Sequence, residues 1–259
     1  MTQPPASVHA ETSLLREVID VVRTVVIGLA AALTLHATLF QPFTIPSSSM
    51  EPGLVVGDYI VVSKPTYGWG LASLPFSPWV SQGRLFDRQA RRGDVVVFRL
   101  PRDPKQTWIK RVIGLPGDRV QVANGQVIVN GQAWTRTSLG QAQDHDAPWR
   151  TVEQVRETQT AADGEPGRSY LTYDGGPGHA GDDTGVYVVP TGQYLVMGDN
   201  RDNSLDGRFA PDVGVGLLPQ GNLVGRAEWI VASWQPGASL FKPWTWLQVR
   251  PDRAFQRIR

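Results

Sequence analysis

The sequence predicts a mainly β protein that begins with one apolar helix. Two observations lead to this prediction. Between Thr24 and Met50 the chain carries no Asp, Glu, Lys or Arg. After that segment, short runs rich in β-branched residues alternate with turn residues and rarely show the spacing of a helix.

The apolar stretch from Val25 to Phe43 has about the 20 residues that a helix needs to cross a bilayer core of about 30 Å. We therefore predict a transmembrane anchor at residues 24–43. A cleavable signal peptide is the alternative, but its apolar core is shorter, about 7–15 residues, and here Glu17 and Asp20 precede the run. We prefer an anchor that stays attached.

The basic residues around this span predict its orientation. Arg16 and Arg23 precede it, in a segment of residues 1–23, whereas the first basic residue after it is Lys64. Positive residues concentrate on the cytoplasmic side of a membrane span. We expect a single-pass protein with a cytoplasmic N-terminus and an extracytoplasmic body.

The body contains eight short runs with the composition of strands, bounded by Gly, Pro, Asn and Asp. Asn124-Gly125 separates two of them and is typical of a two-residue hairpin turn. We predict strands at residues 59–63, 94–100, 108–113, 119–122, 126–129, 186–189, 194–197 and 229–232.

The strand pattern weakens in the middle of the body, where Gln, Asp, Gly, Thr and His predominate. This indicates an insertion between two halves of one β core. The insertion is expected to be a small subdomain or a mobile flap, with a disordered loop as the alternative. The predicted parts are a first core segment at 44–131, the insertion at 132–185, a second core segment at 186–235 and a tail at 236–259.

Two stretches are apolar where a soluble surface is normally polar. Tyr67 to Gly83 carries no charged residue, and the segment 228–249 is rich in tryptophan, which favours the headgroup region of a membrane. For the first two tryptophans of the segment 228–249, core packing and membrane contact remain alternative interpretations. Membrane lipid is the expected partner of Trp244 and Trp246.

Composition excludes several classes of function. The net charge is +1, from 25 basic and 24 acidic residues, and no dense Lys/Arg cluster occurs, so nucleic acid is not an expected partner. The absence of cysteine excludes disulfides, thiolate metal sites and a cysteine nucleophile. Histidines and carboxylates show no metal-ligand spacing, so we expect no metal and no cofactor.

A histidine base for a serine nucleophile is also poorly supported. The four histidines lie before the anchor, inside it, and in the weakly patterned insertion: His9, His36, His145 and His179. A neutral lysine can replace histidine as the base, and Lys110 lies in a strand-like apolar run where burial would lower its pKa. The alternative is a lysine that extends from a strand edge into solvent.

Five ordered segments of the chain resemble the signature segments of bacterial type I signal peptidases. They cover the end of the anchor, residues 43–130 and residues 186–232. The segments are Pro46-Ser-Ser-Ser-Met-Glu-Pro-Gly-Leu54, Gly57-Asp58-Tyr59, Arg92-Gly-Asp-Val-Val-Val-Phe98, Ile109-Lys-Arg-Val-Ile-Gly-Leu-Pro-Gly-Asp118, and Gly198-Asp-Asn-Arg-Asp-Asn-Ser204 followed by Asp206 and Arg208.

The resemblance implies a serine endopeptidase anchored in the bacterial cytoplasmic (inner) membrane. It implies a fold of coiled antiparallel β-sheets, no cofactor, and the signal peptides of exported preproteins as substrates, cut after small residues. By the same resemblance, Ser49 is the nucleophile and Lys110 the general base. The Ser49 backbone N–H and the Ser47 hydroxyl form the oxyanion hole.

The remaining roles also follow from the resemblance. Ser204 orients the lysine by a hydrogen bond. Structural support comes from Asp199, Asp206 and Arg208, and the shallow substrate pockets are lined by Phe43, Ile45 and Ile109. The chain has three consecutive serines at 47–49, and the position directly before Met50 selects Ser49 among them.

Three other functions remain as alternatives. One is a specialised Ser/Lys maturation peptidase of a single secretion or conjugation system. Another is a non-catalytic, membrane-anchored β-domain of the envelope. The third is a self-cleaving DNA-binding regulator, which the anchor and the missing DNA-binding motif disfavour.

Overall fold

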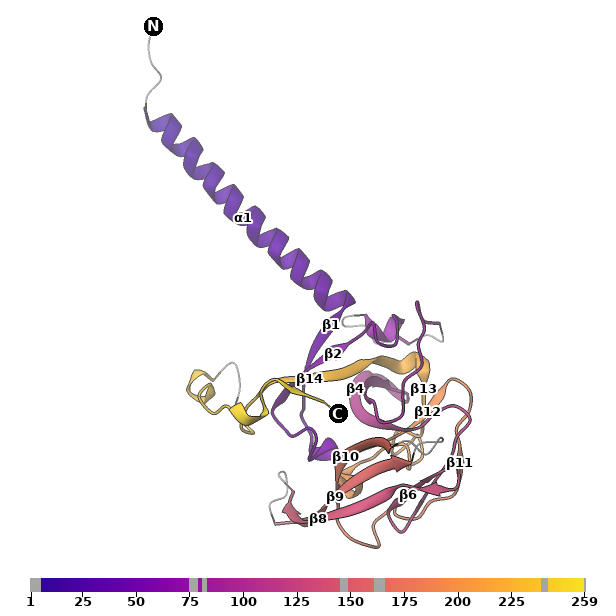
Figure 1. Cartoon of the computed structure of the whole chain (residues 1–259). Helices are drawn as coiled ribbons and strands as arrows, with labels where there is room; N and C mark the ends of the chain where they lie inside the picture. Colours follow the sequence, from indigo (N-terminus) through magenta and orange to yellow (C-terminus); the bar gives the residue numbers. More distant parts are fainter. Residues whose placement is uncertain are drawn as a thin grey trace.

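The structure is a computed structural model that describes residues 6–74, 79–80, 83–144, 149–160, 166–238 and 242–258. One long helix leads into a body of antiparallel β-strands (Figure 1). The elements are α1 Ala6–Thr38, β1 Phe40–Thr44, β2 Asp58–Ser63, β3 Val95–Leu100, β4 Asp103–Gly114, β5 Arg119–Ala123, β6 Gln126–Val129, β7 Gln132–Ala133, β8 Thr135–Gln143, β9 Thr151–Thr160, β10 Pro166–Asp174, β11 Tyr187–Val188, β12 Gln193–Met197, β13 Leu217–Pro219, β14 Leu223–Ser233 and β15 Gln256–Arg257, with short 3₁₀ turns η1 Ser48–Met50, η2 Leu71–Ser73, η3 Arg201–Asn203, η4 Gln220–Asn222, η5 Pro243–Thr245 and η6 Pro251–Arg253.

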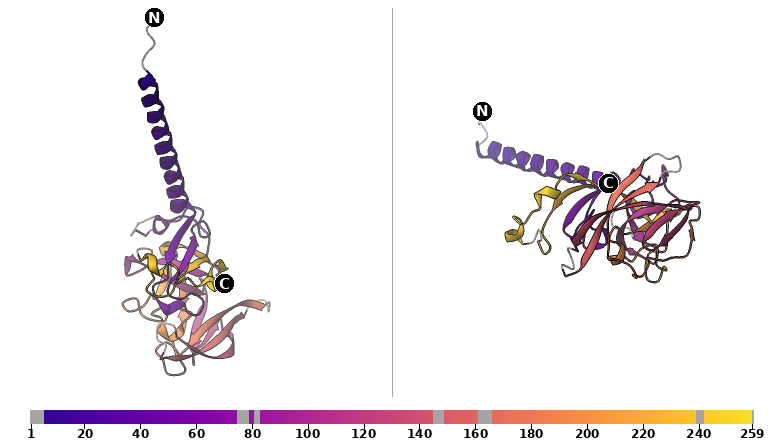
Figure 2. Two further views of the ribbon diagram at one scale, coloured as in Figure 1. Left: turned by 90° about the vertical axis from the view of Figure 1, so that its left-hand side faces the viewer. Right: turned by 60° about the horizontal axis from the view of Figure 1, so that its bottom comes forward.

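Helix α1 projects away from the body in every view (Figures 1 and 2). Its segment Arg16–Leu35 has a mean hydropathy of 2.1 and is long and apolar enough to cross a membrane. The helix differs from the predicted span at both ends, because it begins before residue 24 and ends at Thr38. Pro42 explains the early end: proline lacks the N–H that a helix needs, and residues 40–44 instead pair with β2.

The main sheet confirms the mainly β prediction. Its strand order is β1-β2-β14-β3-β4-β12-β13, with β15 added to β14, and all pairs are antiparallel. Strand β3 is buried on both faces, so Val95 and Val97 join one apolar cluster while Val96 and Phe98 join another. The predicted hairpin at Asn124-Gly125 is present, and both residues have positive φ.

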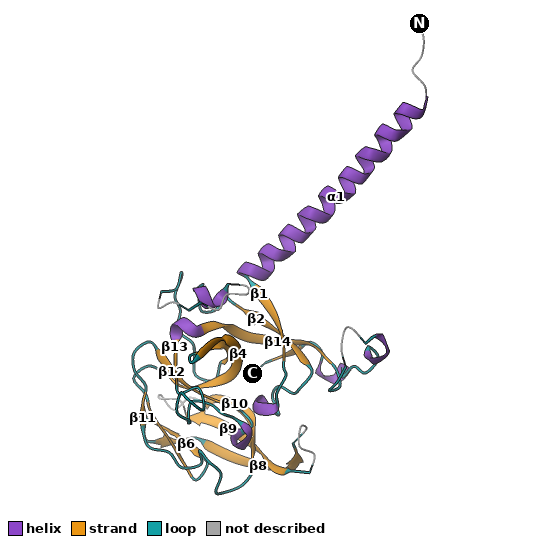
Figure 3. Ribbon diagram, turned by 180° about the vertical axis from the view of Figure 1, so that it is seen from behind, coloured by secondary structure: helices purple, strands orange, loops and turns teal. Residues whose placement is uncertain are grey.

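The insertion is folded in the part that the structure describes, which favours the subdomain over the disordered loop. Strands β8, β9 and β10 form a three-stranded sheet of order β10-β9-β8, and β7 joins a second small sheet of order β11-β5-β6-β7 (Figure 3). Two aromatic residues of the insertion, Trp134 and Tyr170, are buried in one cluster with Val120, Val127 and Met197 of the core segments. The insertion therefore shares a hydrophobic core with the rest of the body.

The two apolar stretches are partly buried and partly exposed. Tyr67, the first residue of one stretch, is a core residue with 1% of its surface exposed. Trp79 is largely exposed, as are Leu85 and Phe86 just beyond the first stretch and Trp244, Trp246 and Leu247 in the tail. Of the two tryptophans left open, Trp229 is 45% exposed and Trp234 is half-buried against the Tyr59 ring. Residues 75–78, 81–82 and 239–241 of these stretches lie outside the described residues.

Candidate active site

Lys110 is held on β4, which pairs with β3 on one side and β12 on the other. The side chain is buried, with 4% of its surface exposed. Burial lowers the pKa of the Lys110 ammonium from 10.5 to about 8; Asp206 and Asp199 oppose part of this shift, and Arg208 adds to it. A substantial fraction of the amine is therefore neutral at moderately alkaline pH, as a general base requires.

Ser49 lies in the 3₁₀ turn η1, where the buried side chain of the next residue, Met50, fixes the turn to the core. The Lys110 Nζ is 2.6 Å from the Ser49 Oγ and 3.0 Å from the Ile109 carbonyl oxygen. No other described residue makes a hydrogen bond to the Ser49 hydroxyl. The structure thus pairs Lys110 with Ser49 and not with the serines beside it.

The two neighbouring serines occupy different environments. Ser47 is exposed and lines the cleft in front of Ser49. Ser48 is buried, and its Oγ accepts a hydrogen bond of 2.8 Å from the Asn203 amide nitrogen. Ser48 is therefore a structural residue that connects η1 to η3. No signal in the sequence indicated this contact.

The segment 198–208 packs directly against Ser49. The Asn200 N–H donates to the Ser49 carbonyl oxygen at 3.2 Å. Gly198 approaches so closely that an added Cβ would come within 2.5 Å of the same carbonyl oxygen, so only glycine fits there. The hydroxyl of Ser204 is buried next to this position and makes no hydrogen bond to any residue that the structure describes. Its predicted bond to Lys110 stays a prediction.

Two buried ion pairs support this segment. Asp199 accepts two hydrogen bonds from Arg111, at 2.7 and 2.6 Å, and Asp206 pairs with Arg208 at 3.0 Å. Burial alone would raise the pKa of Asp206, but Arg208 and the N–H groups of Gly198 and Arg208 lower it below its ordinary value. The Asp206 carboxylate therefore stays ionised, and Asp206 and Asp199 together limit the fall of the Lys110 pKa.

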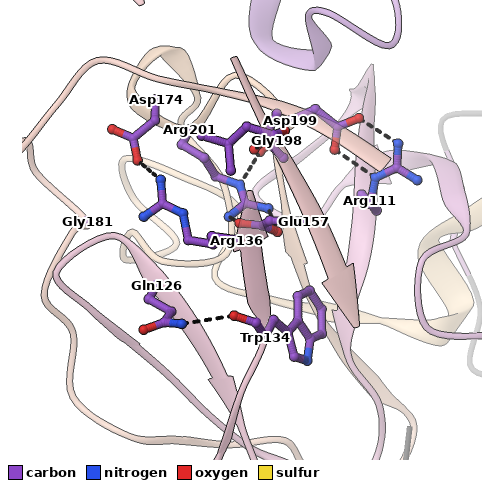
Figure 4. Close-up of polar contacts among 12 residues, drawn as sticks. Arg111, Gln126, Trp134, Arg136, Glu157, Asp174, Gly181, Gly198, Asp199 and Arg201 are labelled. Atoms are coloured by element: carbon purple, nitrogen blue, oxygen red, sulfur yellow. Dashed lines mark hydrogen bonds and ion pairs between the residues drawn. The ribbon is translucent and has the colours of Figure 1, made fainter. Parts of the chain in front are cut away.

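The insertion is bound to the same segment by a third buried ion pair (Figure 4). Arg201 donates two hydrogen bonds of 2.5 Å to the Glu157 carboxylate on β9. The Arg111 guanidinium also lies 4.0 Å from the Tyr170 ring centre on β10. These two contacts hold the segment 198–208 and strand β4 against the strands of the insertion.

Breaking this ion pair is expected to destabilise the protein. Glu157→Ala leaves the buried Arg201 guanidinium without its partner, which costs about 3–5 kcal/mol. Urea unfolding should show this loss, whereas the double variant Glu157→Leu, Arg201→Met, which removes both charges, should recover most of it. Equal destabilisation by both variants would show that the shape of the contact, not the uncompensated charge, matters.

A second stability prediction concerns Lys110. Its pKa of about 8 in the folded state lies below the 10.5 of the unfolded chain, so the unfolded state binds more protons between these values and stability rises with pH across that window. Lys110→Met removes the cost of burying the charge. The variant should be more stable than the parent by up to about 3 kcal/mol at pH 7, and the difference should vanish near pH 10.5.

The measurement is urea unfolding at several pH values. Lys64, a second buried lysine whose pKa is lowered to about 8 by burial and by Arg99, stays in both proteins and cancels in the difference. A difference between the two proteins that is constant from pH 7 to 10.5 would contradict the prediction.

A cleft of about 640 Å³ opens in front of Ser49 and Lys110. Of the three predicted pocket residues, Ile109 lines it. Ile45 is 3% exposed, and with Phe43 it packs in the adjacent apolar cluster that also contains Met50. Phe43 lies on β1, which pairs with β2, and Ile45 directly follows that strand, where its N–H donates to the Asp58 carbonyl oxygen.

The cleft also contains residues that sequence reasoning missed. Trp108, Leu205 and Phe209 provide apolar walls, and Asp202 and His179 provide polar ones. His179 had no sequence signal, because the folding of the insertion alone brings it to the cleft. His145 lies outside the described residues.

The chain is similar in sequence to known signal peptidases. A family model described as signal peptidase, peptidase S26, matches residues 18–234. The signal peptidase I of Rickettsia typhi is 34% identical over 249 residues, which cover 89% of this chain and 90% of the relative, and that of Rickettsia prowazekii is 32% identical over the same length. A solved signal peptidase I from Enterococcus faecalis is 24% identical, with a TM-score of 0.30, over 54% of this chain and 97% of that one.

Proposed function

This chain belongs to the family of signal peptidases, peptidase S26, and from that membership we propose that it removes N-terminal signal peptides from exported preproteins with Ser49 as nucleophile and Lys110 as general base. The family membership makes it a serine endopeptidase. The observation that carries the division of roles is the 2.6 Å contact between the buried Lys110 Nζ and the Ser49 Oγ.

In the proposed mechanism, neutral Lys110 takes the hydroxyl proton as the Ser49 Oγ attacks the carbonyl carbon of the scissile bond. The Ser49 N–H and the Ser47 hydroxyl stabilise the negative charge on the carbonyl oxygen. The C–N bond then breaks, and the Lys110 ammonium returns the proton to the leaving amine. Water, activated by the same lysine, hydrolyses the acyl-enzyme and restores Ser49.

We place this reaction at the outer surface of the bacterial cytoplasmic membrane. Helix α1 supplies the anchor, and Arg16 and Arg23 orient it. The indole N–H of Trp69 donates to the Thr38 carbonyl oxygen at 2.5 Å, which ties the loop around η2 to the end of the helix. The exposed apolar side chains of that loop are suited to contact lipid beside the anchor.

Substrate choice follows from the walls of the cleft. If Ile109, with Phe43 and Ile45 beside it, limits the depth of the pockets, a small residue such as Ala is required immediately before the cut and two positions earlier. A preprotein with Ala at both positions should be cut at that bond. Replacing the Ala immediately before the cut with Phe should reduce the rate by about a hundredfold or more.

Mass spectrometry of the products tests this expectation. The Ser49→Ala variant serves as the blank that reveals cleavage by contaminants. Efficient cutting after Phe or Leu would contradict the pocket assignment. A panel of unrelated signal peptides separates a general signal peptidase from a maturation peptidase of one secretion system, because the latter would cut only one class.

A further inference from the structure

A groove separates the edge of the insertion sheet from the C-terminal strand. Strand β10 is at the edge of its sheet, and β15 pairs only with β14. Between the two strands is a cavity of about 600 Å³, bordered by Ser169 and Leu171 on one side and by Arg257 and Ile258 on the other. It does not share residues with the catalytic cleft.

The groove carries unpaired positive charge. Arg156 and Arg257 line it, and neither guanidinium makes a hydrogen bond or ion pair with any residue that the structure describes. The third arginine, Arg111, is bound to Asp199. No Asp or Glu among the described residues lines this cavity. In a chain of net charge +1, this is a local excess of positive charge.

Both strands also present unpaired backbone groups to the groove. The Tyr173 N–H donates to the Asp199 carbonyl oxygen, away from β9. Alternate residues of a strand point to the same side, so the backbone N–H and C=O of Leu171 and Ser169 also point away from β9. On the opposite side, the Ile258 N–H donates to Glu228 of β14, so the backbone of Arg257 faces away from β14.

We propose that this groove binds an extended acidic peptide segment of a partner protein, which adds a strand to the edge of β10. The backbone of the segment pairs with the open N–H and C=O groups, and its carboxylates pair with Arg156 and Arg257. The apolar side chains of Ile230 and Ile258 accept its alternate residues. A lipid phosphate would satisfy the arginines but not the strand edges, so a peptide fits the groove better. This site is independent of the proposed catalytic function.

The test is isothermal titration calorimetry with the full chain in micelles of an uncharged detergent. The probe is a blocked hexapeptide of alternating Asp and Val. We expect binding that weakens at least about tenfold in the double variant Arg156→Gln, Arg257→Gln, because two charge-assisted contacts are lost. The matched control, Arg88→Gln with Arg119→Gln, removes two exposed arginines elsewhere and should change the affinity less than about twofold.

Two further probes test the strand addition and the ligand class. A peptide N-methylated at alternate residues cannot donate to the strand edge and should bind at least about tenfold more weakly. Absence of binding by the parent, equal loss in both double variants, or full affinity of the N-methylated peptide would overturn the proposal. So would binding of short-chain phosphatidylglycerol that depends on the two arginines while the peptide does not bind. Both double variants should cleave a short signal-peptide substrate at the rate of the parent. This unchanged activity is the control that they are folded.

Discussion

Replacing Lys110 with arginine should lower peptide cleavage by at least about 10³-fold, although the variant keeps the length and the positive charge of the side chain. A general base must lose its proton before it can act. Burial lowers the pKa of Lys110 to about 8, whereas the pKa of arginine is so high that its guanidinium keeps its proton in proteins. Lys110→Met should be equally inactive. Lys105→Arg, an exposed change on the same strand, is the matched control and should keep full activity.

The pH profile of the parent provides the second part of this test. With a pKa of about 8, roughly a tenth of Lys110 is neutral at pH 7. The rate on a short peptide should therefore rise with pH through about 8 and level off above it. His179→Gln should leave this limb unchanged, since His179 makes no hydrogen bond to Ser49. Turnover by Lys110→Arg would rule out the Ser/Lys pair. So would loss of the rise of the rate with pH in the His179→Gln variant.

Ser49→Ala should abolish cleavage while the thermal unfolding transition stays close to that of the parent. The hydroxyl that contacts Lys110 is the nucleophile in the proposed mechanism, and no other described serine has such a contact. Ser47→Ala should lose about 10²–10³-fold in turnover, as expected for an oxyanion donor. Both variants are assayed on the same short peptide, with the mass of the products recorded.

Ser48→Ala is the control beside them. It removes the acceptor of the Asn203 amide and should cost about 1–3 kcal/mol of stability, but its turnover should stay within about tenfold of the parent. Residual cleavage by Ser49→Ala together with inactive Ser48→Ala would move the nucleophile to Ser48.

Local sequence patterns predicted the central strands well. Strands β2, β5, β6 and β12 lie almost where their β-branched runs indicate, because buried strands need such residues whatever surrounds them. The Asn124-Gly125 turn depends only on two residues that tolerate positive φ. The apolar helix was found from its composition, but its end was not, because β1 competes with the helix for residues 40–44 by pairing with β2.

The strands of the insertion could not be predicted in this way. Strand β8 is exposed along most of its length and carries polar residues, so its extended state depends on pairing with β9. The arrival of His179 at the cleft and the pairing of Arg201 with Glu157 follow from how the insertion packs on the core. Side chains far apart in the sequence carry no local signal of such contacts.

By itself, the sequence determined the β architecture and the apolar helix, and the resemblance of its five segments made Ser49 and Lys110 the candidate nucleophile and base. Only the tertiary structure decided that these two meet at 2.6 Å, that Ser48 is tied to Asn203, and that burial lowers the lysine pKa to about 8. The physical reason is that a hydrophobic pattern reports which residues prefer burial. Desolvation and hydrogen bonding instead depend on which distant groups the fold brings within a few ångströms.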